Sequence, residues 1–265
     1  MKVVIAGAGG RMGRTLIEAV LKDKSLSLAS AFDLPAGGLI GKDAGELVGA
    51  ACGVNIGAEA QVAIAAGDVI IDFTRPEATM AHLDLCVAAG VRMVIGTTGF
   101  TDVQKQQIAD ASKKIGIVMA PNFAIGVNVT FKLAEVAAKS LGDAFDVEII
   151  EAHHRHKVDA PSGTALRLGE VVAGALGRNL SEVALHGREG ITGERDRQSI
   201  AFHAIRGGDI VGEHTVIFAG EGERVEVTVR SQSRMTYALG ALRSCQYLAG
   251  RANGLYDMQD VLGLR

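Results

Sequence analysis

Cationic side chains that can transfer protons gather in one short stretch of this sequence. Three histidines, an arginine and a lysine fall within five positions, from His153 to Lys157. Like charges side by side repel one another, so an anionic ligand explains this arrangement better than packing does. Histidine adds a proton donor whose pKa lies near neutral pH. The cluster therefore indicates proton donation to a small substrate that carries carboxylates.

The residues that flank the cluster suit the same chemistry. Pro161 to Thr164 form a Pro-Ser-Gly-Thr turn, which offers backbone N–H groups, a hydroxyl and the start of a helix for an anion. Glu148 and Glu151 precede the cluster. They are either a catalytic carboxylate pair or, as we favour, counter-charges for the neighbouring cations.

Metal binding by the histidines is the weaker alternative. His153, His154 and His156 lie on or beside an expected strand, where neighbouring side chains point to opposite faces. No nearby cysteine completes a zinc pattern. We therefore predict no metal site. The isolated histidines His186, His203 and His214 are interpreted as structural.

Composition narrows the class of protein. The 265 residues are 48% hydrophobic but only 4% aromatic, with 34 glycines, which favours an α/β protein with close helix–sheet packing. A net charge of −3 argues against a broad nucleic-acid surface. The three cysteines have no metal-binding spacing, no apolar run has membrane length, and the sequence begins directly with a strand. We expect a soluble cytoplasmic protein that contacts neither nucleic acid nor membrane.

A glycine-rich turn near the start predicts a dinucleotide site. Residues 2–6 form a buried strand, the turn follows, and a helical run begins after it, which is the order that opens a Rossmann domain. The GxGxxG pattern fails because Met12 stands where a glycine belongs, whereas GxxGxxG fits Gly7, Gly10 and Gly13. The expected phosphate contacts come from Gly7, Ala8, Gly9, Gly10, Arg11 and Met12.

An acidic residue stands in the expected place after the second strand. Asp33 can accept hydrogen bonds from the adenosine ribose hydroxyls. Leu34 follows it, and no arginine stands beside it for a 2′-phosphate, although Arg11 could reach one. The cofactor is therefore NADH or NADPH, with NADH favoured. A Rossmann-like domain without nucleotide is the alternative, and the agreement of glycine loop, helix and acid argues against it.

Two later strand ends belong to the same edge of the expected parallel sheet. Ligands of such sheets sit beyond the carboxyl ends of the strands. One strand ends in Gly96, Thr97 and Thr98, which we place at the nicotinamide ribose or ring. The next ends in Ala120, Pro121, Asn122 and Phe123. Ordinary turn chemistry is the alternative for both segments.

The pattern changes after Asn122 and predicts a second domain. We assign residues 1–126 and 234–265 to a dinucleotide-binding domain and 127–233 to a substrate domain with a mixed, mostly antiparallel sheet and helices on one face. A helix over 235–250 should pack back on the first domain. Residues 186–198 are polar and glycine-rich, which predicts a mobile loop.

Several motifs together resemble one family. EIIEAHHRHKVDAPSGTA, with GAGGRMG, IDFTRPE, VIGTTGF, HGREGITGER and GDIVGEHT, closely resembles the 4-hydroxy-tetrahydrodipicolinate (dihydrodipicolinate) reductases. The resemblance runs from the first strand to the C-terminus. It implies NAD(P)H-dependent reduction of 4-hydroxy-tetrahydrodipicolinate, or its dehydrated form, in the diaminopimelate route to lysine.

The resemblance also implies roles for single residues. The family's proton donor matches His153 and its substrate-binding lysine matches Lys157. His154 and the Gly163-Thr164 turn match positions that hold the substrate's carboxylates.

On the cofactor side, the family binds the nucleotide along the segments matching Gly7 to Met12, Asp33, Gly96 to Thr98 and Ala120 to Phe123. In many members an arginine follows the acid, where this chain has Leu34. The resemblance implies a homotetramer built through the substrate-domain sheets, which makes residues 127–233 the oligomerisation domain as well.

Other functions fit the sequence less well. A sugar dehydrogenase has no need of so many cations against a neutral substrate. A nucleotide-sensing regulator would carry a DNA-binding element, and the sequence shows none. A catalytically dead relative would not need the intact cluster from His153 to Lys157.

Overall fold

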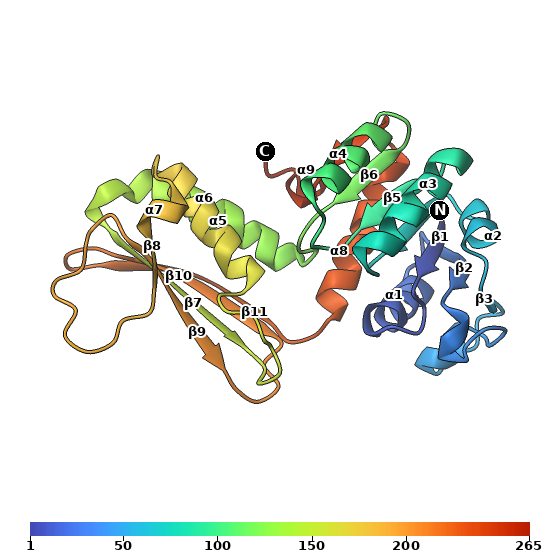
Figure 1. Ribbon diagram of the computed structural model, residues 1–265, viewed down its shortest axis with the longest axis horizontal. Helices are drawn as coiled ribbons and strands as arrows, with labels where there is room; N and C mark the ends of the chain where they lie inside the picture. Colours follow the sequence, from blue (N-terminus) through green and yellow to red (C-terminus); the bar gives the residue numbers. More distant parts are fainter. The chain divides into compact units, whose positions relative to one another are not determined.

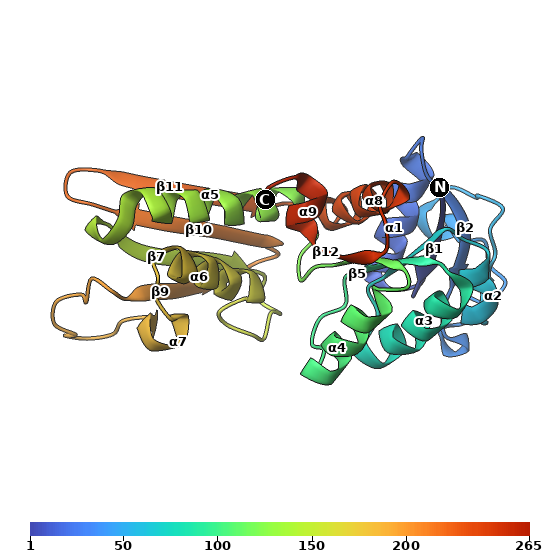
Figure 2. The same ribbon diagram turned by 90° about the horizontal axis from the view of Figure 1, so that it is seen from above.

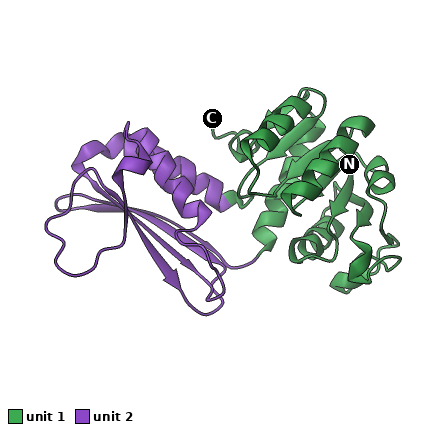
Figure 3. Ribbon diagram, viewed as in Figure 1, with its two compact units in different colours: residues 1–125, 234–265 green, residues 126–233 purple.

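The computed structural model describes residues 1–265 as two compact units. Unit 1 comprises residues 1–125 and 234–265, and unit 2 comprises residues 126–233 (Figure 3). No helix in either unit is both long and apolar enough to span a membrane. Each unit has its own sheet and its own set of helices (Figure 1).

Unit 1 is built on a seven-stranded parallel sheet in the order β12-β6-β5-β4-β1-β2-β3. The strands are β1 (Lys2–Ala6), β2 (Ser27–Phe32), β3 (Ile56–Gly57), β4 (Val69–Asp72), β5 (Arg92–Ile95), β6 (Gly116–Met119) and β12 (Gly254–Tyr256). The helices are α1 (Arg11–Lys22), α2 (Ala60–Ala65), α3 (Pro76–Ala89), α4 (Asp102–Ala111), α8 (Met235–Ala249) and α9 (Met258–Leu262). Short 3-10 turns cover Pro35–Gly37 and Gly45–Val48. The predicted Rossmann arrangement is confirmed.

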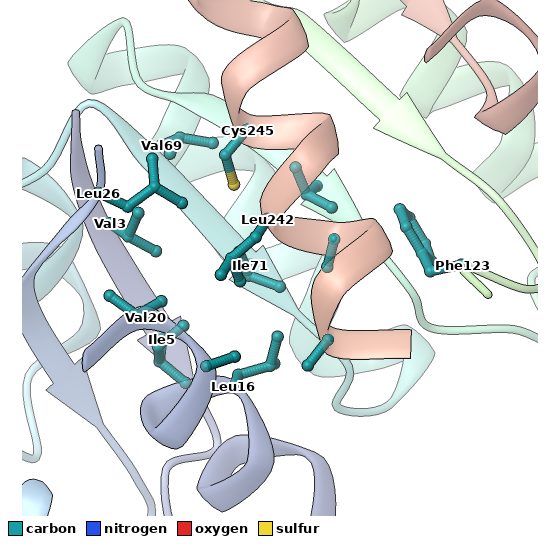
Figure 4. Close-up of a cluster of buried hydrophobic side chains, with 14 of the residues drawn as sticks. Val3, Ile5, Leu16, Val20, Leu26, Val69, Ile71, Phe123, Leu242 and Cys245 are labelled. Atoms are coloured by element: carbon teal, nitrogen blue, oxygen red, sulfur yellow. The ribbon is translucent and has the colours of Figure 1, made fainter. Parts of the chain in front are cut away.

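Both faces of this sheet are buried. Val3 and Ile5 of β1 belong to the core on one face, together with α1, α8 and α9, whereas Val4 and Ala6 belong to the core on the other, with α2, α3 and α4. Figure 2 shows these two helix layers, and Figure 4 shows the first core with Leu242 and Cys245 of α8 against the sheet. Parallel strands covered twice are continuously apolar, as these are. The expected return of the C-terminal helix to the first sheet is confirmed.

Unit 2 has a five-stranded mixed sheet in the order β11-β10-β7-β9-β8. Its elements are α5 (Ile125–Leu141), a 3-10 turn (Gly142–Ala144), β7 (Asp146–His153), α6 (Gly163–Ala175), α7 (Leu180–Val183), β8 (Ala184–His186), β9 (Ile200–Arg206), β10 (Gly212–Ala219) and β11 (Arg224–Ser231). The predicted mixed sheet is confirmed. β10 is antiparallel to β7 and β11, whereas β9 is parallel to β7 and β8, and the two antiparallel ladders contain the larger share of the paired residues. The short edge strand β8 was not predicted. Helices α5 and α6 lie over one face (Figures 1 and 2).

The segment predicted as a mobile loop has neither helix nor strand between Gly187 and Ser199. Arg195 anchors its second half to β7. The guanidinium donates to Asp146 and Glu148 at 2.9 Å each and to the carbonyl of Val147 at 2.9 Å. Arg188, near the start of the loop, also donates to Glu148, so side chains from both halves of the loop bond to the sheet. The mobility of the loop stays a prediction.

Candidate active site

The glycine loop of unit 1 has the close backbone packing that a pyrophosphate site requires. Gly7 has a φ of +67°, and the N–H of Gly10 donates to its carbonyl at 3.0 Å. A Cβ on Gly13 would lie 2.1 Å from the same carbonyl, so only glycine lets α1 start so close to the loop. Gly10 caps α1 without a side chain. The first turn of α1 is therefore suited to an anion.

Asp33 is fixed against this loop. One carboxylate oxygen accepts the Gly9 N–H at 2.6 Å and the other accepts the Leu34 N–H at 2.7 Å. A Cβ on Gly9 would lie 2.3 Å from the Leu39 side chain, which the sequence did not single out. Leu34 is 75% exposed, and its apolar side chain offers no charge to a 2′-phosphate. The geometry fits an adenosine ribose beside the loop.

Phe73, between β4 and α3, connects the two other segments predicted to contact the nucleotide. Its ring lies 5.4 Å from that of Phe123, and a Cβ on Gly96 would lie 2.2 Å from it. Phe123, Ala120 and Thr97 are buried, whereas Thr98 and Pro121 are exposed. Asn122 accepts the Ala124 N–H at 2.8 Å. The buried members can present backbone rather than side chains to a ligand.

A buried polar network that the sequence did not reveal lies beneath these strand ends. Asp72 is fully buried and accepts from the Thr74 hydroxyl at 2.6 Å, and the His82 imidazole lies 2.7 Å from its other oxygen. Thr97 joins through Thr79 at 2.9 Å. Satisfied networks of this kind hold side chains in one arrangement. Asp72 therefore supports the predicted nicotinamide segment from below.

In unit 2 the register of three strands brings other residues to the predicted proton donor His153. Glu151 and His153 are two residues apart on β7 and so share a face. His214 of β10 pairs with Glu151, and Arg206 of β9 pairs with His153. All four side chains lie on the face that α6 covers, because Val147 and Ile149 of the same face form its core. The two strands thus add a cation and a histidine to the predicted cluster.

Glu151 is the centre of this group and is 1% exposed. Arg206 donates to both of its oxygens at 2.7 Å, His153 Nδ1 lies 2.7 Å from Oε2, and the Ser162 N–H donates to Oε1 at 3.1 Å. Burial acts to raise the pKa of Glu151, but hydrogen bonds from Arg206 and His153 outweigh it and the pKa lies below its usual value. Glu151 is therefore an anion that orients its neighbours.

The protonation of His153 follows from two opposed effects. Burial lowers the pKa of His153, and the hydrogen bond to Glu151 offsets this only in part, so the net shift is downward. Glu151 favours the protonated form of His153, but its effect on the pKa is smaller than that of burial. With Nδ1 held by Glu151, Nε2 is the atom left to exchange a proton. A Cβ on Gly212 would lie 3.2 Å from Nε2, so glycine keeps that side open.

The turn after β7 carries the remaining members of the predicted cluster. Lys157 Nζ lies 2.8 Å from Asp159, and the Lys157 N–H donates to the His154 carbonyl at 3.1 Å. His154 Nδ1 is buried without a hydrogen-bond partner. Arg155 and His156 are exposed. The cluster is thus partly buried and partly exposed.

Ser162 begins α6, where its hydroxyl accepts the Ala165 N–H at 3.2 Å. The predicted helix start is confirmed, and Gly163 and Thr164 form its first turn.

The two glutamates of β7 are not a catalytic pair. Glu148 is three residues from Glu151 and points to the opposite face, where it pairs with Arg188, Arg195 and His203 at 2.6–3.1 Å. The favoured interpretation as counter-charges is confirmed, although the partners of Glu148 come from outside the cluster. No group of three or more side chains in the chain is arranged to hold a metal ion.

Family models match almost the whole chain. Residues 1–123 match the model described as dihydrodipicolinate reductase, N-terminus, and residues 126–262 match the model described as dihydrodipicolinate reductase, C-terminus. The 4-hydroxy-tetrahydrodipicolinate reductase of Aromatoleum aromaticum is 62% identical over 100% of this chain and 96% of its own length. The enzyme of the same name from Dechloromonas aromatica is 60% identical over 100% and 98%.

Solved structures share the fold of this chain. The dipicolinate-bound dihydrodipicolinate reductase from Paenisporosarcina sp. TG-14 is 29% identical, with a TM-score of 0.77 over 98% of each chain. The WlbA dehydrogenase from Thermus thermophilus, solved with NAD and UDP-GlcNAcA, shares the fold at 12% identity, with a TM-score of 0.59 over 100% of this chain and 92% of that one. The chain belongs to the 4-hydroxy-tetrahydrodipicolinate reductase family.

Proposed function

We propose that His153 is the proton donor in the reaction of this family. As a member of it, the enzyme is an NAD(P)H-dependent oxidoreductase that reduces 4-hydroxy-tetrahydrodipicolinate in the diaminopimelate route to lysine. The observation that carries the proposal is the position of His153. Its Nδ1 is held by a buried carboxylate and its Nε2 lies beside Gly212, where no side chain blocks it. A donor whose ring is fixed on one side and open on the other suits general acid catalysis.

The cations around His153 suit a substrate with two carboxylates. Dipicolinate, the ligand named for the relative from Paenisporosarcina, is a dicarboxylate of this kind. Lys157 would bind one carboxylate as a point charge, and His154 with the Gly163-Thr164 turn would hold the other. A bound dianion raises the pKa of a neighbouring imidazole. His153, whose pKa is lowered without substrate, would thus take up its proton as the substrate binds.

The residues of unit 1 fit the nicotinamide nucleotide. The loop Gly7–Met12 would receive the pyrophosphate, Asp33 the adenosine ribose, and the segments Gly96–Thr98 and Ala120–Phe123 the nicotinamide half. The reduced nicotinamide, when bound, supplies the hydride that adds to the substrate's conjugated imine. The donor His153 would then protonate the adjacent carbon, so one hydride and one proton complete the reduction of the dehydrated form, and the hydroxyl of 4-hydroxy-tetrahydrodipicolinate leaves as water before the hydride adds.

Turnover of the wild-type enzyme tests the proposed binding of the substrate and the nucleotide, whereas replacement of His153 tests the donor role. NADH and NADPH oxidation would be followed with substrate generated in place from pyruvate and aspartate semialdehyde. Rapid turnover with either nucleotide is the expected result. Tight nucleotide binding without any turnover would contradict it and point to a different anionic substrate.

We propose that NADH is the preferred nucleotide, because Leu34 offers no charge to a 2′-phosphate. Leu34→Arg is expected to raise the ratio of kcat/KM for NADPH over NADH about tenfold, or about 1.4 kcal/mol, since a guanidinium pairs with phosphate. Val62→Arg is the matched control, because Val62 is 71% exposed in the same unit but lies on α2. An unchanged ratio in Leu34→Arg would show that this position does not set the preference.

We also propose that the chain forms a homotetramer through the sheet of unit 2. The face opposite α5 and α6 carries Ile150, Ile217 and the 51% exposed Ile205. Apolar side chains on an uncovered sheet face favour association. Sedimentation equilibrium at micromolar concentration should give the mass of four chains, and the mass of one chain would refute the assembly.

A further inference from the structure

His214 adjoins the proposed proton donor although it lies sixty-one positions away in the sequence. It is 4% exposed, and its ring centroid lies 5.2 Å from that of His153 with the planes at 74°. An edge-to-face contact at this distance restricts the rotation of both rings. His214 is thus packed against the very ring whose orientation the reaction depends on.

Ser162 holds His214 in place. Its hydroxyl lies 2.9 Å from His214 Nε2 and also accepts the Ala165 N–H as the N-cap of α6. The backbone N–H of Ser162 donates to Glu151 at 3.1 Å. His153 contacts Glu151, Glu151 is hydrogen-bonded to Ser162, Ser162 lies within hydrogen-bond distance of His214, and the His214 ring packs against His153. These contacts connect the start of α6 to the orientation of the His153 ring.

The other imidazole nitrogen of His214 argues against a role in packing alone. Nδ1 is buried and has no hydrogen-bond partner. A buried polar atom without a partner costs about 1–3 kcal/mol, a cost that an apolar side chain of similar shape avoids. If the side chain at position 214 only filled space, phenylalanine would do so without an unpaired polar atom. Histidine differs from phenylalanine in its hydrogen bond to Ser162.

The charges around His214 keep it out of proton transfer. The charged groups that act on it are Glu151 and His153 of β7 and Lys157 of the turn that follows. Burial, followed by the neighbouring His153, lowers the pKa of His214 to about 4. The His214 ring is therefore neutral near pH 7, which leaves His153 as the imidazole of this pair that can exchange a proton with the substrate.

We propose that His214, held by Ser162, is a positioning residue for the reductase reaction that fixes the ring of His153 relative to the first turn of α6. The proposal rests on the donor role proposed for His153. Because a displacement of about 1 Å can cost a factor of about 10² in rate, a small rotation of His153 is sufficient for a large effect.

His214→Phe tests the proposal, because it keeps a flat ring but loses the bond to Ser162. It is expected to lower kcat at least tenfold, to shift the limb of the pH profile that belongs to His153, and to leave NADH affinity within about twofold. Ser162→Ala should reproduce the pH shift, since it removes the same bond from the other side. His203→Gln is the control, because this histidine also contacts a glutamate but on the opposite face of the sheet.

The possible results distinguish failure of the positioning role of His214 from failure of the donor role of His153. If His214→Phe keeps kcat within twofold and the pH profile of wild type, the positioning role is refuted. If activity falls only in proportion to folded protein, as followed by the unfolding temperature, a structural role replaces it. Where His214→Phe does not fold, His214→Gln retains the bond to Ser162 without the ring and should also lose rate. If His153→Gln itself retains full activity, the donor assignment fails instead.

Discussion

Replacement of His153 with glutamine is expected to lower kcat by a factor of about 10²–10⁴ while nucleotide affinity changes little. That range is the usual contribution of a positioned general acid. Glutamine can still hydrogen-bond to Glu151, so the loss would reflect the missing proton rather than a collapsed site. The nucleotide loop lies in unit 1, and the NADH dissociation constant should therefore stay within about twofold. Steady-state kinetics and NADH fluorescence titration measure the two quantities.

The matched control for this prediction is His156→Gln. His156 belongs to the same cluster but is exposed and makes no hydrogen bond to Glu151. Near wild-type kcat in this variant would separate the role of His153 from the general charge of the cluster. Equal losses in both variants would point to electrostatic attraction of the substrate rather than to proton donation.

Glu151→Gln should impair both stability and catalysis. It leaves Arg206 without its buried counter-charge and removes the carboxylate that fixes His153 Nδ1. Breaking a buried ion pair in this way lowers the free energy of unfolding by about 3–5 kcal/mol. We expect a value near the low end of this range because the Arg206 side chain is 21% exposed. A fall in kcat of about 10² or more is expected as well, since the tautomer of His153 is no longer specified. Urea unfolding and steady-state kinetics measure the two losses.

The pH dependence of this stability has a definite sign. The pKa of Glu151 is lowered in the folded state, so its contribution is complete above its unfolded pKa of about 4.5 and is lost as the pH falls through the folded pKa. The pKa of His214 is lowered to about 4 from 6.5, so the folded state also loses stability as the pH falls through that interval. Glu151→Gln should remove the first component and enlarge the second, because the charge of Glu151 raises the pKa of His214 against burial.

Glu148→Gln is the control for the glutamate. Glu148 has a similar set of cationic partners on the opposite face of the same strand. The Glu148→Gln variant should be less stable than wild type, but its folded fraction should keep a kcat close to that of wild type. A comparable fall in kcat in both variants would mean that strand β7 as a whole, rather than Glu151, sets the rate.

Local patterns were sufficient to predict the strand, loop and helix of the proposed nucleotide site and the position of Asp33 beside them. The glycine loop, the helix after it and Asp33 are close in sequence, and their chemistry depends on backbone conformation that residue type reports. Strands β3, β8 and β12 were not predicted because two or three residues are too few to show a period. These short segments adopt strand conformation because their backbone groups form hydrogen bonds with a neighbouring strand.

The substrate half was predictable only in part. Glu151 and His153 share a face by simple alternation, and the same alternation excludes Glu148, so that signal was present in the sequence. Arg206 and His214 arrive by strand pairing across about fifty residues or more, and register between distant strands leaves no mark on either segment alone. The histidine judged structural on its own is therefore beside the proposed donor.

The discontinuity of unit 1 has a consequence for how the chain is made. The core on one face of its sheet combines Val3 and Ile5 of β1 with Leu242 and Leu248 of α8. During synthesis from the N-terminus, the first strand leaves the ribosome more than two hundred residues before the helix that covers it. Unit 2, by contrast, has all of its strands by Ser231. The earliest-made sheet is therefore the last to be completed, and the part of its apolar face that α8 and α9 cover stays exposed until these helices are synthesised.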